Sequence, residues 1–190
     1  MSKRVLVPLA QGCEELEAIT ITDILSRGGV EVITASLDDN REIHASRGAV
    51  LLASTTLEAV QDEDFDLVVL PGGLPGADYL QQDGRILNIL RRMHQVGKPT
   101  AAICAAPKVL REAGLLDGHK ATSYPGVLDA QPAPGMEYID APVVEDDNII
   151  TSKGPGTAMD FALYLVEKLQ GRAVRDEVEA ALQRPPCHGG

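Results

Sequence analysis

One ten-residue stretch decides the fold: Lys98-Pro99-Thr100-Ala101-Ala102-Ile103-Cys104-Ala105-Ala106-Pro107. Its apolar first half predicts a strand. Pro107 suits the first turn of a helix, because its fixed φ is helical and its missing N–H needs no partner there. Cys104 is therefore expected on a sharp strand-to-helix turn near a helix N-terminus, where the helix dipole favours the nucleophilic thiolate. A cysteine in an apolar run also fits a small buried hydrophobe, and this stretch alone leaves both interpretations open.

The composition limits the class of protein. The chain has 190 residues, of which 44% are hydrophobic and only 3% aromatic. Such a core is built from Val, Ile, Leu and Ala, as in a parallel sheet covered by helices. The net charge of −11 argues against binding to membranes or to nucleic-acid backbones in general.

The cysteines and the N-terminus indicate where the protein works. Cys13, Cys104 and Cys187 show neither metal-ligand nor redox-pair spacing, which is typical of a reducing compartment. The apolar run after Arg4 is too short for a signal peptide or a membrane span. We therefore expect a cytoplasmic protein that holds no metal.

Apolar runs separated by glycine turns predict one α/β domain over residues 1–183 and a flexible tail at 184–190. The expected strands are 5–9, 30–35, 65–70, the apolar strand that ends at Cys104, and 120–123, with one or two short strands within 42–52 and a hairpin at 143–151. The expected helices are 14–27, 57–60, 85–96, 108–113, 156–169 and 173–182. Met159, Phe161, Ala162, Leu165 and Val166 are expected on the apolar face of the helix at 156–169. The first strand–helix turn lacks the dinucleotide glycine fingerprint, so no cofactor is expected.

Glu17 is the carboxylate most directly linked to the cysteine. The turns at 11–17, 71–76 and 104–107 follow predicted strands and are expected at one edge of the sheet. Glu17 shares a helical face with Ile21, so its carboxyl is expected to be buried, with a raised pKa that keeps it protonated near neutral pH. The alternative is a carboxylate that a loose first turn tilts toward solvent.

Other polar groups near Cys104 are weaker candidates. The backbone N–H groups of Gly72, Gly73 and Ala105 are candidates for an oxyanion hole beside the sulfur, although most Pro-Gly-Gly turns are only turns. Cys13 is either a second thiol near the site or a buried loop cysteine. The four histidines are all expected in solvent, so none is placed as a base for Cys104; they are His44, His94, His119 and His188.

The combined pattern resembles the ThiJ/PfpI superfamily, in the branch of the human parkinsonism-associated deglycase and its bacterial relatives. The matching motifs run in the family's order through residues 3–182. They are Gly12-Cys13-Glu14-Glu15-Leu16-Glu17-Ala18, Ser46-Arg47-Gly48, Val69-Leu70-Pro71-Gly72-Gly73, Ala101-Ala102-Ile103-Cys104-Ala105-Ala106-Pro107 and Thr151-Ser152-Lys153-Gly154-Pro155-Gly156-Thr157.

The resemblance implies a flavodoxin-like doubly wound sandwich and a homodimer. It implies that Cys104 is the nucleophile and that a protonated Glu17 is its partner. The oxyanion donors would be Gly73 and Ala105, with Gly72 nearby. The remaining residues that the resemblance brings to the pocket or the dimer interface are Arg27, Arg47 and the loop that contains Pro155.

Two departures from the family narrow the chemistry. The protease branch carries histidine directly after the cysteine, where this chain has Ala105, so proteolysis is not expected. The human branch has a histidine before a proline where this chain has Tyr124-Pro125. A phenol has a pKa near ~10 and is a poor base at neutral pH. Either Glu17 handles the proton transfers alone or Tyr124 only positions the substrate.

Three functions remain open from the sequence. The first is a glutathione-independent glyoxalase or deglycase that acts on methylglyoxal-type 2-oxoaldehydes or early glycation adducts and releases lactate-type hydroxy acids. The second is a redox-sensing stress protein or chaperone, in which Cys104 is oxidised to a sulfinic acid stabilised by Glu17. The third is a ligand-binding member of the family in which the cysteine has neither role.

Overall fold

The computed structural model describes residues 1–185, and every structural statement below concerns this part of the chain. The strands are β1 (Arg4–Leu9), β2 (Glu31–Ser36), β3 (Glu42–His44), β4 (Val50–Leu52), β5 (Thr55–Thr56), β6 (Leu67–Leu70), β7 (Thr100–Ile103), β8 (Lys120–Ala121), β9 (Glu137–Tyr138), β10 (Val143–Asp146) and β11 (Ile149–Ser152). The helices are α1 (Glu15–Arg27), α2 (Leu57–Val60), α3 (Gly76–Gln82), α4 (Gly84–Gln95), α5 (Pro107–Glu112), α6 (Ala158–Gln170) and α7 (Arg172–Ala181), with a 3-10 turn η1 (Pro155–Thr157) before α6.

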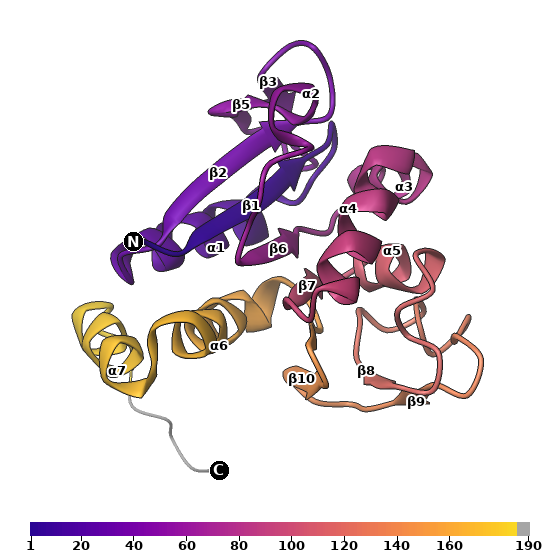
Figure 1. Cartoon of the computed structure of the whole chain (residues 1–190). Helices are drawn as coiled ribbons and strands as arrows, with labels where there is room; N and C mark the ends of the chain where they lie inside the picture. Colours follow the sequence, from indigo (N-terminus) through magenta and orange to yellow (C-terminus); the bar gives the residue numbers. More distant parts are fainter. Residues whose placement is uncertain (186–190) are drawn as a thin grey trace.

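Seven strands form one central sheet in the order β10-β11-β7-β6-β1-β2-β5. All neighbours in it are parallel except β10, which forms an antiparallel hairpin with β11. Helices α1 and α6 pack together on one face with α7 beyond them, while α4 covers β6 and β7 on the other face beside α5 (Figure 1). The prediction of a doubly wound α/β sandwich is therefore confirmed.

Two hydrophobic layers enclose the sheet, because successive side chains of a strand point to opposite faces. In β6, for example, Leu67 and Val69 pack toward α1 and α6, whereas Val68 and Leu70 pack toward α4 and α5. Every residue of β6 and β7 is buried. This double burial explains why the central strands are continuous apolar runs without polar alternation.

The chain reverses its direction of sheet growth between β1 and β6. From β1 it adds β2 and β5 on one side, and it then returns to add β6, β7 and β11 on the other side. Ligands of open α/β sheets bind at this kind of switch point, outside the carboxyl ends of the strands. The loops at 10–14 and 71–76 emerge here and are joined by backbone hydrogen bonds from Glu14 N to Gly72 O (2.9 Å) and from Gly76 N to Gly12 O (3.3 Å).

Several details differ from the sequence-based expectations. Strands β5 and β9 were not predicted, because two residues are too few to show a strand pattern, and the strand expected at 120–123 is the shorter β8. Helix α3 was not predicted, because Gly76 and the preceding prolines indicate a turn. Met159 was expected on the buried face of α6 but is 37% exposed. Arg184, the first residue of the expected tail, forms an ion pair with Asp160 at 2.8 Å. Residues 186–190 lie outside the described part of the chain, so the rest of the tail stays a prediction.

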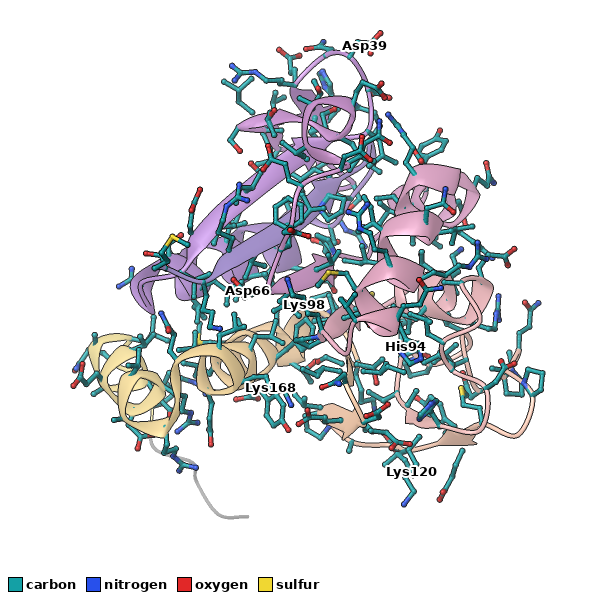
Figure 2. The ribbon with its side chains drawn as sticks, in the orientation of Figure 1. Asp39, Asp66, His94, Lys98, Lys120 and Lys168 are labelled. Carbon is teal, nitrogen blue, oxygen red and sulfur yellow. The ribbon has the colours of Figure 1, made fainter. Side chains whose placement is uncertain are left out.

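Charged side chains lie at the ends and edges of the molecule. Asp39 is exposed at the tip of the loop after β2, and Lys120 is exposed at the opposite end, on β8 (Figure 2).

Among residues 1–185, no helix combines the length and the apolar character that a membrane crossing requires.

Replacing the first residue of α3 tests the contact between the two loops. A Cβ on Gly76 would lie 2.7 Å from the backbone nitrogen of Cys13, whereas a Cβ on Gly84, the first residue of α4, would meet no atom within 4 Å. We expect Gly76→Ala to lower the free energy of unfolding by about 2 kcal/mol or more. Gly84→Ala should be neutral, or stabilising by up to about 1 kcal/mol. Urea denaturation measures the free energy of unfolding of both variants. Equal effects of the two substitutions would contradict the close contact between the loops at 10–14 and 71–76.

Candidate active site

Cys104 lies at a strained corner between β7 and α5. Its φ is +65°, a left-handed backbone conformation that residues other than glycine rarely adopt. Two backbone hydrogen bonds hold this corner, one from Cys104 N to Ser152 O (3.0 Å) and one from Tyr124 N to Cys104 O (2.8 Å). The half-buried side chain therefore projects from the carboxyl end of β7, as the strand-to-helix pattern predicts.

Glu17 approaches Cys104 from the first turn of α1. Its side chain is completely buried, on the same face as Ile21 and Ile24, so the expected burial is confirmed. Oε1 accepts a hydrogen bond from Gly72 N at 2.9 Å. Oε2 is buried and has no hydrogen-bond partner among the described residues.

Gly72 allows this close approach, because no larger residue fits between the two side chains. A Cβ on Gly72 would lie 2.7 Å from Cys104 Cβ and 2.9 Å from Glu17 Oε1. Gly73 is confined in the same way, since its Cβ would lie 2.4 Å from Glu14 N, and its φ is +89°. Gly72 therefore lets the loop after β6 lie against the Cys104 side chain and the Glu17 carboxyl, and Gly73 lets the same loop lie against the backbone of residues 12–14.

The ionisation of Glu17 is shifted by its surroundings. Burial raises the pKa of Glu17 from 4.5 to about 7, while the N–H of Gly72 and the thiol of Cys104 act in the opposite direction. A carboxyl with this pKa is protonated in about half of the molecules at neutral pH. The sequence-based expectation of a raised pKa is thus confirmed in direction.

The ionisation of Cys104 contradicts one expectation. Burial and the neighbouring Glu17 carboxylate raise the pKa of Cys104 to about 12, against the opposing N–H groups of Gly73 and Ala105. Helix α5 has only six residues, and its N-terminus does not outweigh burial beside an anion. The expected resting thiolate is therefore wrong, and the thiol must lose its proton to a neighbouring base when it reacts.

The oxyanion donors also need a correction. Gly72 was expected to be one of three donors, but its N–H is already bonded to Glu17 Oε1. The N–H groups of Gly73 and Ala105 remain, and both lower the pKa of Cys104 as donors to its sulfur. They are suitably placed to bind an oxyanion that forms beside this sulfur.

A pocket of about 370 Å³ opens above Cys104. Its lining residues come from six segments of the chain: Glu14, Ser46, Arg47, Gly73, Leu74, Cys104, Ala105, Tyr124 and Pro155. Glu14 caps α1 by accepting a hydrogen bond from Leu16 N (3.4 Å), and its other oxygen accepts one from Ser46 Oγ (3.1 Å). The pocket is thus small enough for a compact substrate and carries one carboxylate at its rim.

Most of the remaining candidates are brought to this pocket. Arg47, Tyr124 and Pro155 line it as expected. Arg27 does not, because it lies at the other end of α1, where it pairs with Asp23. Its expected place at a dimer interface stays a prediction.

Cys13 and the described histidines lie outside the pocket lining. Cys13 is buried in the loop before α1, and burial followed by the Glu15 carboxylate raises its pKa to about 12. His44 and His94 are exposed (Figure 2 labels His94). His119 is half-buried and pairs with Asp146 at 3.3 Å, which differs from the expected solvated position. His188 and Cys187 lie outside the described residues.

Two contributors were not foreseen from the sequence. Leu74 lines the pocket, and Ser152 holds the corner at Cys104 through its carbonyl oxygen. Ser152 lies within the motif at 151–157 and Leu74 directly follows the motif at 69–73, but neither residue was assigned a role from the sequence. Within residues 1–185, no group of three or more His, Cys, Asp or Glu side chains is arranged to hold a metal ion.

Comparison with known proteins defines the family. The sequence pattern described as the DJ-1/PfpI family matches residues 3–168. The chain belongs to the DJ-1/PfpI family. The Drosophila melanogaster Protein dj-1beta is 42% identical over 183 residues, which cover 96% of this chain and 97% of the relative. The Caenorhabditis elegans protein named glutathione-independent glyoxalase DJR-1.2 is 36% identical, with coverage of 98% and 96%.

Some relatives are much longer than this chain. Protein DJ-1 homolog A of Arabidopsis thaliana is 39% identical over 99% of this chain, but the match spans only 48% of that relative. For homolog B of the same plant, 41% identical over 89% of this chain, the match spans 38%. The chain therefore covers about half or less of these plant proteins.

Solved structures of the DJ-1/PfpI family share the fold. The crystal structure of Drosophila melanogaster DJ-1beta has a TM-score of 0.93 at 41% identity and covers 97% of this chain and 100% of that one. A Toxoplasma gondii DJ-1 structure described as oxidized has a TM-score of 0.90 at 38% identity, covering 95% and 98%. The flavodoxin-like fold expected from the sequence is therefore confirmed.

The pKa of Glu17 predicts how stability depends on pH. Between pH 4.5 and about 7 the folded protein keeps a proton on Glu17 that the unfolded chain releases. The free energy of unfolding should therefore fall as the pH rises through this window, by on the order of 3 kcal/mol, and level off above it. Glu17→Gln should remove this part of the slope.

Chemical denaturation of both proteins from pH 4.5 to 8 measures the difference. Glu177→Gln, at an exposed glutamate of α7, is the control and should follow the wild type. Parallel curves for the wild type and Glu17→Gln would show that the carboxyl is not protonated by burial.

Proposed function

We propose that the protein is a glutathione-independent glyoxalase or deglycase, acting on methylglyoxal-type 2-oxoaldehydes or early glycation adducts. The observation that carries this proposal is the pairing of Cys104 with a buried carboxyl whose pKa is about 7. In the first step, ionised Glu17 takes the thiol proton while the sulfur adds to the aldehyde carbon, giving a hemithioacetal. The N–H groups of Gly73 and Ala105 stabilise the oxygen that becomes negative.

Glu17 then acts on the carbon atoms of the adduct. It first passes the thiol proton to the negative oxygen of the adduct and is ionised again. It then removes the proton from the former aldehyde carbon and returns it to the neighbouring carbonyl carbon, while the hydroxyl proton passes to the oxygen of that second carbon, so that the hemithioacetal becomes a thioester of a hydroxy acid. Water hydrolyses the thioester, releasing lactate and the Cys104 thiol. Overall, one water is added to methylglyoxal, and no external oxidant or reductant is consumed.

The similarity to a relative named as a glyoxalase supports this reaction class. The site itself supports it through its proton balance. A base with a pKa near neutrality accepts and returns a proton with similar ease at pH 7. Glycation adducts contain the same hydroxy-carbonyl unit, so deglycation needs no additional catalytic group.

A redox-sensing role at Cys104 is the second candidate, with a stress-protein or chaperone activity as its extension. The Toxoplasma gondii relative has been solved in a form described as oxidized, and the unpartnered Oε2 of Glu17 is available to an oxidised sulfur. The raised pKa of Cys104 disfavours this role, because peroxide reacts with the thiolate.

We place either function in the cytoplasm, since Cys13 and Cys104 are both free thiols.

Turnover of methylglyoxal without glutathione tests the proposed enzyme. The wild type should form many equivalents of lactate per protein chain. Cys104→Ser and Glu17→Gln should each reduce kcat by about a hundredfold or more, because each removes a group needed in both steps. Lactate is measured enzymatically, and both lactate stereoisomers are assayed.

Glu177→Gln serves as the control and should keep wild-type turnover. At most one equivalent of product, together with stoichiometric oxidation of Cys104 by dilute peroxide, would reject the enzyme in favour of the sensor.

We also propose that the protein is a homodimer. Exposed apolar side chains lie on α1, on β4 and near the start of α6: Leu16, Ile19, Val50, Leu52 and Met159. These elements contribute to the same half of the core, and the turn between β3 and β4 is bonded to α1 through Arg47 N and Glu15 Oε2 at 3.1 Å. Contiguous exposed apolar surface is typical of a protein–protein interface.

A charge placed on this surface should separate the subunits. We expect Ile19→Glu to convert the dimer to a monomer at micromolar concentration, as measured by sedimentation velocity. Val96→Glu is the matched control, since Val96 is also an exposed apolar residue, at the end of α4 on the other side of the sheet. A wild-type monomer, or a dimer unaffected by Ile19→Glu, would refute this interface.

A further inference from the structure

A second hollow adjoins the Cys104 pocket and has no part in the chemistry above. Its volume is about 380 Å³. It is lined mainly by apolar groups of three segments: Tyr124, Pro125, Asp140, Ala141, Pro142, Lys153, Gly154, Pro155, Gly156 and Thr157. The two charged residues at its rim, Lys153 and Asp140, pair with each other, so neither carries an unbalanced charge into the hollow.

The walls of the hollow are fixed by a short hydrogen-bond network. Ser152 Oγ donates to Pro142 O (2.7 Å), and it shares a hydrogen bond with Thr157 Oγ1 (2.7 Å). Thr157 Oγ1 in turn bonds to the backbone of Gly154, at 3.1 Å to the oxygen and 3.2 Å to the nitrogen. The hollow is therefore preformed, and its loop is attached to the same strand end that supports Cys104.

The hollow and the Cys104 pocket share two walls. Tyr124 and Pro155 line both spaces. The Tyr124 ring lies against Gly154, where an added Cβ would come within 3.2 Å of Cδ2. Its backbone N–H donates a hydrogen bond to Cys104 O. Tyr124, which separates the two spaces, is therefore held in place by the residue that carries the nucleophile.

We infer that this hollow receives the substituent of the carbonyl substrate, and that the preferred substrates are 2-oxoaldehydes with an aryl or branched alkyl group. The inference rests on the proposed function. The aldehyde carbon must reach Cys104, and the rest of the molecule then extends past Tyr124 and Pro155. A methyl group leaves the hollow empty, whereas a phenyl ring removes its apolar walls from water.

The test compares phenylglyoxal with methylglyoxal. In the wild type, kcat/KM should be at least about tenfold higher for phenylglyoxal. Ala141→Phe fills the hollow from one wall, and Gly156→Leu fills it from another, where an added Cβ meets no atom within 4 Å. Each variant should lower the ratio of the two kcat/KM values by about tenfold.

Ala180→Phe, at an exposed alanine of α7, is the matched control and should keep the wild-type ratio. Because each ratio is compared with that of the wild type, the different intrinsic reactivities of the two aldehydes cancel. An unchanged ratio in both Ala141→Phe and Gly156→Leu would overturn the inference.

Alkylation separates this inference from the proposed function. Phenacyl bromide and bromoacetone each lose bromide as the Cys104 sulfur forms a bond to their carbon, and this needs no turnover. If the wild type converts neither glyoxal, the ratio of the two alkylation rates at Cys104, measured by peptide mass spectrometry, replaces the kcat/KM ratio. A ratio that falls about tenfold in both hollow variants would support binding of the substituent in the hollow even if the protein is not a glyoxalase. An unchanged ratio would reject binding in the hollow.

Discussion

The site depends on a carboxyl buried against a thiol. Glu17 has no contact with solvent and receives one hydrogen bond, from Gly72. Burying a carboxylate in apolar surroundings is unfavourable, and raising the pKa to about 7 corresponds to roughly 3 kcal/mol against the charged form. The apolar sheet and helix α1 supply the stability that allows this group to remain buried beside Cys104. The fold therefore raises the pKa of Glu17 by keeping its carboxyl buried.

The same constraint explains the glycines and the strained cysteine. There is no room for a Cβ at residue 72 between Glu17 and Cys104. The two side chains can therefore lie close together only because residue 72 is a glycine. The positive φ of Cys104 costs about 1–2 kcal/mol. That cost is offset by the hydrogen bonds that Cys104 makes with Ser152 and Tyr124. Strain at one residue is thus supported by segments about 20 and 50 positions away in the sequence.

The sequence predicts those features that depend on local pattern. The apolar runs predict the buried strands, and the helical spacing of Glu17, Ile21 and Ile24 predicts a buried carboxyl. The direction of the Cys104 pKa was missed, because it depends first on how deeply the thiol is buried and then on how close the Glu17 carboxylate comes to the sulfur. The use of the Gly72 N–H by Glu17 was missed for the same reason. Met159 was misplaced because helical periodicity does not reveal which apolar stripe an adjoining element leaves uncovered.

The two pKa values together favour one order of events at neutral pH. With Cys104 near 12 and Glu17 near 7, the pair keeps its proton on sulfur whenever the carboxyl is ionised. Under the proposed mechanism, the sulfur therefore becomes nucleophilic as Glu17 takes its proton. Once the sulfur is bonded to carbon, its negative charge is gone, and the protonated carboxyl is left beside the carbon atoms of the adduct. In the proposed mechanism this proton passes to the oxygen of the adduct, and the ionised Glu17 then serves as the base at carbon, which makes an additional base at Tyr124 unnecessary.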